Sequence, residues 1–362
     1  MSETPIAPVA SRRAVAWWLL AVATMILVMV ILGGLTRLTH SGLSMVEWRP
    51  VTGWLPPLND AEWEDAFRKY QQYPEYRALN YGMTLDGFRS IYWLEYVHRV
   101  WGRLLAIVFA APCVFFLTRR WVDRATGARL GVLFVLGALQ GVLGWLMVQS
   151  GLVDRPDVSH YRLTAHLGLA LALFGYTVWL FLEAARPASR IPPGREGLGF
   201  RRSAGVLAAG VFVTALSGGL VAGLDAGFVF NTFPLMDGRL VPGDLLEMRP
   251  LYLNPFENLA TVQFDHRVLG AVVILGAIVL FWRVRGSSAP LRARVAAGIL
   301  AATAAVQVGL GILTLVLAVP VVLGVLHQAG AFVLFAVALW TFRELRAVPA
   351  PAPQAAPAGP RP

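Results

Sequence analysis

Four of the six histidines occupy matching positions near the start of four long apolar segments. Two imidazoles that face each other across a four-helix bundle can hold haem iron from both sides. One such histidine could equally be a structural residue bonded to a carbonyl, but four at equivalent positions favour haem. Zinc and copper are disfavoured because no pair has the i, i+3 or i, i+4 spacing of those sites and no thiolate joins them. The predicted iron ligands form two pairs, His98 with His166 and His266 with His327.

A carboxylate accompanies the first of these histidines and has no counterpart in the second half of the chain. Glu95 lies three residues before His98, so the two share a face of a helix. Gln263 stands at the same distance before His266, with nearly the same shape but no ionisable group. A carboxylate beside a porphyrin can act as a base or stabilise positive charge, and the structural alternative is an ion pair with Arg99. This asymmetry predicts a substrate in the first half and a permanent cofactor in the second.

Other polar residues near the histidines have two interpretations each. Arginines at the same end of the apolar segments could pair with haem propionates or extend to lipid headgroups. Gln140 and Gln307 could form hydrogen bonds in the core or touch a macrocycle edge, and the sequence does not choose. His40 and His160 fall in loops, where structural or surface roles are expected. The predicted propionate partners are Arg99, Arg103, Arg162 and Arg267.

The composition is that of an integral membrane protein. Of 362 residues, 57% are hydrophobic and 14% are charged, too few to cover a soluble globule of this size. The formal charge is +10, but the basic residues form short clusters between apolar segments, as in cytoplasmic loops, which argues against nucleic acid as a partner. Cys113 is the only cysteine and lies in an apolar segment, so we expect a small buried side chain and no intramolecular disulfide.

Eight segments are apolar over about the 20 residues that a bilayer requires, which predicts an all-α fold with eight transmembrane helices. Arginines gather on one side of them, so the positive-inside rule places both termini in the cytoplasm and the histidines near the periplasmic surface. Asn59 is expected to cap a surface helix, and Asn254 with Pro255 to begin the sixth span above the membrane. The predicted spans are 15-35, 94-118, 130-150, 163-183, 204-222, 266-283, 295-318 and 322-342.

The chain also contains an internal repeat. The segment EYVHRVWGRLLAI at 95-107 matches QFDHRVLGAVVIL at 263-275, LQGVLGWLMV from Leu139 matches VQVGLGILTLV from Val306, and Gly33-Gly34 matches Gly218-Gly219. Each half has an even number of spans, so both enter the membrane the same way up, as a parallel repeat of two four-helix bundles. The expected parts are a cytoplasmic N-terminus (1-13), a substrate bundle (14-185), a cytoplasmic linker (186-202), a cofactor bundle (203-346) and a disordered tail (347-362).

These motifs together resemble the heme A synthase family, in its proteobacterial and mitochondrial-type branch, which lacks a loop cysteine pair. The resemblance rests on GGLTRLTHSGLSMVEWRPVTGWLPPLN from Gly33, on the ExxHR of Glu95 to Arg99 and on the four histidines. It implies an oxidoreductase that converts a ring methyl of haem O to the formyl group of haem A by successive hydroxylations. It also implies that His98 and His166 flank the substrate iron, that Glu95 is the catalytic carboxylate, and that His266 and His327 ligate haem b.

The same resemblance implies a place in a bacterial inner membrane and a role in cytochrome oxidase assembly. It allows contact with haem O synthase and formation of a homo-oligomer, and it names no electron donor or acceptor. Two histidines on one iron leave no open position for O2, so either a ligand leaves or the inserted oxygen comes from water. The main alternative is a non-catalytic dihaem b electron-transfer protein, which would use all four histidines alike and leave Glu95 dispensable.

Overall fold

The computed structural model describes residues 9–48, 52–151, 158–185 and 195–346. Within these ranges eight helices are long and apolar enough to cross a membrane, which confirms the predicted all-α fold and the number of spans. No strand is present in the described part of the chain. The eight helices are α1 (Val9–Leu38), α4 (Leu85–Thr118), α5 (Arg124–Gly151), α6 (His160–Ala185), α7 (Arg195–Gly223), α9 (Leu259–Arg285), α10 (Leu291–Val316) and α11 (Val321–Glu344).

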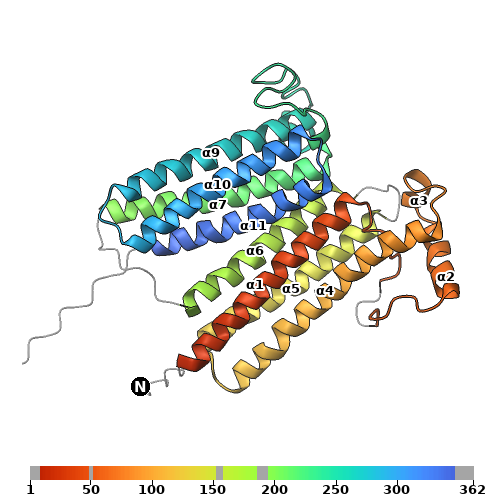
Figure 1. The fold of residues 1–362 in the computed structure, drawn as a ribbon, viewed down its shortest axis with the longest axis horizontal. Coiled ribbons are helices and arrows are strands. Elements are labelled where there is room, and N and C mark those ends of the chain that lie inside the picture. Colours follow the sequence, from red (N-terminus) through yellow and green to blue (C-terminus); the bar gives the residue numbers. More distant parts are fainter. Residues whose placement is uncertain (1–8, 49–51, 152–157, 186–194, 347–362) are drawn as a thin grey trace, which may run out of the picture.

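The long helices pack in two groups (Figure 1). In the first group α1 contacts α4 and α6, and α5 contacts α6; in the second α7 contacts α9 and α11, and α10 contacts both α9 and α11. The groups touch through α6 with α7 and α11, and through α1 with α11. We call the end of the helices that carries the four histidines the outer end, and the end that carries Arg13 and Glu344 the inner end. That the two groups are copies of one parallel repeat stays a prediction, as does the cytoplasmic location of the inner end.

Short helices cover the outer end of the first group. They are α2 (Asp60–Tyr70) and α3 (Pro74–Ala78), and α2 packs on the beginning of α4. Asn59 caps α2 as predicted, because its side chain accepts a hydrogen bond from Glu62 N at 3.0 Å. Trp63 and Tyr70 of α2 are buried against Phe88 and Tyr92 of α4. This aromatic cluster extends α4 nine residues beyond the predicted start of its span.

The second outer loop differs from its prediction. It contains the 3-10 helices η1 (Ala226–Phe228) and η2 (Leu251–Leu253) and the short helix α8 (Asn254–Glu257). The prediction that Asn254 caps a helix continuous with the sixth span is wrong. The cap of α9 is Asn258, whose extended backbone separates α8 from α9 and whose side chain accepts from Thr261 N at 3.0 Å. Asn254 is instead buried, and its amide donates to the carbonyls of Met248 and Leu251.

Other predicted boundaries shift as well. Helix α7 begins at Arg195, so residues 195–202 of the predicted linker are helical. Helix α1 begins at Val9, inside the predicted polar N-terminus. Residues 1–8, 186–194 and 347–362, which include the predicted disordered tail, lie outside the described ranges. Cys113 lies inside α4 and is a buried free thiol, as expected.

Candidate functional site

Each of the four predicted iron ligands lies against a glycine of a neighbouring helix. A Cβ atom added to that glycine would lie 3.4 Å from Nε2 of His98, and 3.3, 3.0 and 2.8 Å from Cε1 of His166, His266 and His327. The imidazoles therefore fill the space that a side chain would otherwise take. The glycines are Gly33 of α1 for His98, Gly144 of α5 for His166, Gly218 of α7 for His266 and Gly311 of α10 for His327.

The glycine contacts follow the same pattern in both groups of helices. Gly33 and Gly218 are matched in the sequence repeat, and so are Gly144 and Gly311. In each group, one histidine contacts a glycine of the first long helix (α1 or α7), and the other histidine contacts a glycine of the third (α5 or α10). This arrangement explains why the glycines recur with the histidines. Each pair of neighbouring helices must approach closely at the level of the imidazole ring.

The two histidines of the second group face each other. The ring centroids of His266 and His327 lie 6.2 Å apart, and the ring planes are nearly perpendicular, at 84°. Metal–imidazole bonds of roughly 2 Å on both sides of one ion would place the two rings about 6 Å apart. The spacing therefore fits a single metal ion held from both sides.

Ser217 determines which nitrogen of His266 is free. Its hydroxyl oxygen lies 2.8 Å from His266 Nδ1, and it donates its only proton to the Thr214 carbonyl at 2.8 Å. Ser217 must then accept a hydrogen bond from Nδ1–H, which leaves the lone pair on Nε2 available to a metal. The sequence analysis missed Ser217. The signal was its position directly before Gly218, where the first half has Leu32.

The two glutamines that had alternative interpretations are part of the core. Gln140 Nε2 donates to the His166 carbonyl at 3.1 Å, and Gln307 Nε2 donates to the His327 carbonyl at 2.8 Å. Gln307 Nε2 also lies 3.2 Å from His327 Nδ1. By contrast, His166 Nδ1 is buried and has no hydrogen-bond partner within the described ranges. A buried ring nitrogen without a partner fits a site that a ligand completes.

Glu95 is buried and makes the ion pair with Arg99 that was the structural alternative. Its exposed fraction is 3%. Oε1 accepts from Arg99 Nε at 3.0 Å and Nη2 at 2.5 Å, whereas Oε2 accepts from Ser44 Oγ and Met45 N, both at 2.7 Å. Four donors occupy the roughly four lone-pair sites of the carboxylate. Glu95 thus connects α4 to the loop that follows α1.

Gln263 of the second group occupies a similar position with opposite polarity. Its Oε1 accepts from Arg267 Nη2 at 2.9 Å, and its Nε2 donates to the Ala226 carbonyl at 2.8 Å. In the first group a carboxylate therefore accepts hydrogen bonds from the outer loop. In the second group an amide donates a hydrogen bond to a carbonyl of the outer loop. Of these two matched side chains, only Glu95 can carry a negative charge.

The arginines predicted to bind propionates contact protein groups. Arg99 donates to the carbonyls of Met45 at 2.6 Å and Glu47 at 2.9 Å, and Arg267 donates to the Phe230 carbonyl at 2.8 Å. Both fasten an outer loop to a long helix. Arg103 stacks over the Trp54 ring at 5.6 Å, and Arg162 donates to the Leu146 carbonyl at 3.0 Å.

The remaining two histidines do not join either pair. His40 is exposed in the turn after α1, with a left-handed backbone (φ 49°). His160 stacks on Tyr161 and lies 3.5 Å from Glu257, and it closes against Gly223 of α7. His160 is the first residue of α6 and not a loop residue as predicted, and its structural role stays a prediction.

Comparison with known proteins places the chain among assembly factors of a respiratory enzyme. The family described as cytochrome oxidase assembly protein, COX15-CtaA, matches residues 16–339. A "Heme A synthase" of Nitrosospira multiformis is 46% identical over 339 residues, which is 93% of this chain and 95% of the relative. Another of the same name from Paramagnetospirillum magneticum is 50% identical, covering 92% and 94% of the two chains. The human "Heme A synthase COX15" is 45% identical, covering 94% and 84%.

Proposed function

Because the chain belongs to the COX15-CtaA family of cytochrome oxidase assembly proteins, we propose that it is a heme A synthase, an enzyme that oxidises haem O to haem A. It works as a multi-pass protein of a bacterial inner membrane, with both termini in the cytoplasm. Its product serves cytochrome oxidase, whose assembly gives the family its description. Contact with haem O synthase and self-association are further expectations of this proposal.

The two groups of helices have different tasks in this proposal. His98 and His166 bind the iron of the substrate haem O between α4 and α6. His266 and His327 hold haem b between α9 and α11, where their ring spacing of 6.2 Å suits one ion. Haem b, when bound, supplies one-electron transfer. Arg103 and Arg162 are the proposed propionate partners in the first group, whereas Arg99 and Arg267 would have to give up loop carbonyls to take that role.

The polar surroundings of the rings support this division. In the second group, the Ser217 hydroxyl lies at His266 Nδ1, where it can accept the ring proton and hold the imidazole in one orientation, as suits a ligand that keeps one metal permanently. In the first group Leu32 stands in place of Ser217, and His166 Nδ1 is without a partner among the described residues. Ligands with fewer fixed contacts suit a haem that must enter and leave.

The single observation that carries the proposed division is that Glu95 of the first group stands where the second group has Gln263, each bonded to the arginine one turn further along its helix. All four lone-pair sites of Glu95 are taken, so it acts by its negative charge and by holding the loop at Ser44 and Met45. A fixed negative charge near the substrate methyl group stabilises positive charge that develops there during oxidation. Glu95 can accept a proton only after one of its donors withdraws.

The test is the substitution Glu95→Gln, which gives the first group the residue of the second. Pigments extracted from the purified protein, expressed with haem O synthase, are separated by chromatography. We expect haem b and haem O to be retained and the haem A yield to fall roughly 100-fold, the effect of losing one electrostatic contact to a transition state. Glu257→Gln is the matched control, because Glu257 is a partnered carboxylate at the same end, accepting from Tyr161.

Two outcomes would contradict the proposal. Normal haem A yield from Glu95→Gln would remove Glu95 from the reaction. Haem b in both groups, with no haem A from the unaltered protein under any expression condition, would instead indicate the electron-transfer alternative.

A further inference from the structure

A cavity opens between the two groups of helices at the inner end, far from the histidines. Its volume is about 840 Å³, and its walls come from α1 and α6 on one side and α10 and α11 on the other. Figure 1 shows the two groups meeting at the outer end and diverging toward the inner end. The cavity occupies the mouth of this wedge, between the two halves of the fold.

Small residues let the two groups approach at the outer end: a Cβ on Gly168 of α6 would lie 2.6 Å from Leu216 of α7, and one on Gly34 of α1 would lie 3.2 Å from Gln328 of α11.

At the inner end the two groups meet only in part. Helices α6 and α11 contact each other through Trp179 and Phe342, whose ring centroids lie 5.9 Å apart, whereas Trp17 of α1 and Trp340 of α11 line the cavity. Trp17 is 69% exposed, a large apolar surface for a residue that faces another helix group.

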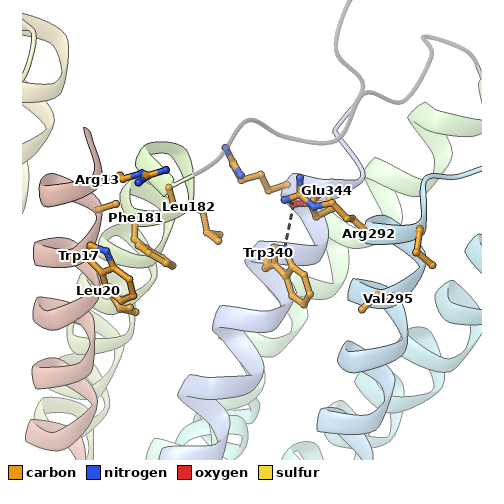
Figure 2. A pocket seen from close by; sticks show the side chains of 13 residues that line it. Arg13, Trp17, Leu20, Phe181, Leu182, Arg292, Val295, Trp340 and Glu344 are labelled. Carbon is orange, nitrogen blue, oxygen red and sulfur yellow. Dashed lines mark hydrogen bonds and ion pairs between the residues drawn. The ribbon is translucent and has the colours of Figure 1, made fainter. Parts of the chain in front are cut away.

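The rim of the cavity is cationic and its walls are apolar. Arg13, Arg292 and Arg343 line it together with one acid, Glu344, so the charged groups sum to +2. In Figure 2, Arg13 stands on one side of the gap and Arg292 on the other, with Trp17 and Trp340 below them. Glu344 is fully buried and accepts from Arg292 Nη2 at 2.9 Å and from Trp340 Nε1 at 3.3 Å. The carboxylate is therefore covered and paired with Arg292, Arg343 is buried, and the open rim presents the guanidinium groups of Arg13 and Arg292.

The order of groups along the cavity matches the order of groups in a lipid. Guanidinium groups lie at the inner rim, and below them come two indole rings together with aliphatic and phenyl side chains such as those of Leu20, Phe181 and Val295. Tryptophan and arginine are the residues that favour the interfacial and headgroup levels of a bilayer. Between membrane-spanning helices a gap with apolar walls is filled by lipid chains in preference to water.

We propose that this cavity binds one anionic phospholipid, with its phosphate between Arg13 and Arg292 and an acyl chain along Leu20, Phe181 and Val295. The lipid fills the cavity between the two groups of helices, beside the contact of Trp179 with Phe342. A zwitterionic lipid fills the same volume but leaves the net charge of the rim uncompensated. This site lies at the opposite end of the helices from the histidines and does not depend on the proposed reaction.

The experiment measures phospholipid bound to the full-length protein by native mass spectrometry. The detergent-purified protein is delipidated and titrated with dioleoylphosphatidylglycerol or dioleoylphosphatidylcholine. We expect one phosphatidylglycerol to bind preferentially, and Arg13→Gln to weaken it about fivefold, as one arginine near a lipid surface contributes. Arg12→Gln is the matched control, because Arg12 is the neighbouring exposed residue of α1 and does not line the cavity. It should leave the affinity unchanged.

A second pair of variants tests the apolar part without changing charge. Val295→Trp fills the cavity wall and should remove the preferential adduct, whereas Val279→Trp, at an exposed position of α9 outside the cavity, should not. Equal binding of the two lipids by the unaltered protein would overturn the proposal. So would equal losses from Arg13→Gln and Arg12→Gln, or a phosphatidylglycerol adduct that survives Val295→Trp in a folded protein.

Discussion

The Ser217 hydroxyl lies 2.8 Å from His266 Nδ1 and donates its own proton to the Thr214 carbonyl at 2.8 Å, so its oxygen is placed to accept a hydrogen bond from Nδ1–H. One hydroxyl thereby selects the tautomer of a predicted iron ligand. The residue next to it, Gly218, provides the space in which the same imidazole lies. Two consecutive residues of α7 thus set both the position and the protonation of a side chain on α9.

The first prediction follows from this contact. Ser217→Ala removes the acceptor from Nδ1, so His266 loses its fixed tautomer and orientation. Loss of such a partner typically weakens metal binding by roughly 10- to 100-fold. The affinity is measured by titrating haem into the haem-depleted protein and following the absorbance of the reduced form. We also expect the midpoint potential of the bound haem to change. Ser203→Ala, about four turns away on α7, is the control. Unchanged affinity and potential would show that Ser217 only packs there.

A second prediction concerns the glycine contacts. In Gly218→Ala the new methyl group would lie 3.0 Å from His266 Cε1, closer than ordinary contact, so the ring must move. Overpacking of this kind costs about 1–3 kcal/mol. We expect reduced haem b content with the protein still folded. Gly210→Ala on the same helix is the control, because its methyl would meet Val273 at an ordinary 3.5 Å. Equal haem b content in the two variants would contradict the role of Gly218.

A third prediction addresses the two arginines that fasten the outer loops. Arg99→Gln should loosen the loop at Met45 and Glu47, and Arg267→Gln the loop at Phe230, because each guanidinium donates to those carbonyls. Hydrogen bonds to charged groups contribute about 1.5–3 kcal/mol each, so amide exchange should accelerate at least tenfold. Hydrogen exchange with mass spectrometry measures the exchange rates of the backbone amides in both loops in one experiment. Each variant is the control for the other. Faster exchange in both loops from either variant would indicate general unfolding.

Much of the architecture could be predicted because it depends on periodicity and length. Eight apolar segments, the Asn59 cap and the positions of the histidines are local features of the sequence. The cap of α9 could not be chosen locally, because Asn254 and Asn258 are both good capping residues. Packing decides between them: the side chain of Asn254 is buried by Met248 and Leu251, which leaves Asn258 to cap the helix.

The positions of the four histidines were predictable from the repeat, whereas their surroundings were less so. Histidines and glycines recur in the repeat, whereas Ser217 and Ser44 interact with residues about 50 positions away. Such contacts depend on how α7 meets α9, and on where the loop after α1 folds back, and neither follows from a single segment. The structure also favours the ion pair of Glu95 with Arg99, which had been weighed as the lesser interpretation. That contact leaves a role for the charge of Glu95 but reduces its availability as a base.

The last prediction uses the aromatic cluster of α2 and α4, which lies outside the bundle. Tyr70 is fully buried, and burial raises the pKa of its phenol above the ordinary value of 10.0, with the carboxylate of Glu75 acting in the same direction. A raised pKa means that the neutral phenol is favoured in the folded cluster. Its contribution to stability is therefore complete below pH 10 and is lost as the pH rises toward the folded pKa.

We thus expect residues 60–80 to become susceptible to proteolysis when the pH rises above about 10, while the long helices stay protected. Tyr70→Phe removes this ionisable group, so the protease sensitivity of this segment should increase less over that range; the remaining increase comes from Tyr92, whose pKa burial also raises. The substitution also removes the acceptor of Asn80 Nδ2, a contact of 2.7 Å, so its sensitivity at neutral pH should be higher than in the unaltered protein. Tyr81→Phe, at a residue that is 85% exposed, is the control and should keep the original pH dependence. An identical rise in sensitivity for Tyr70→Phe would assign the effect to another group.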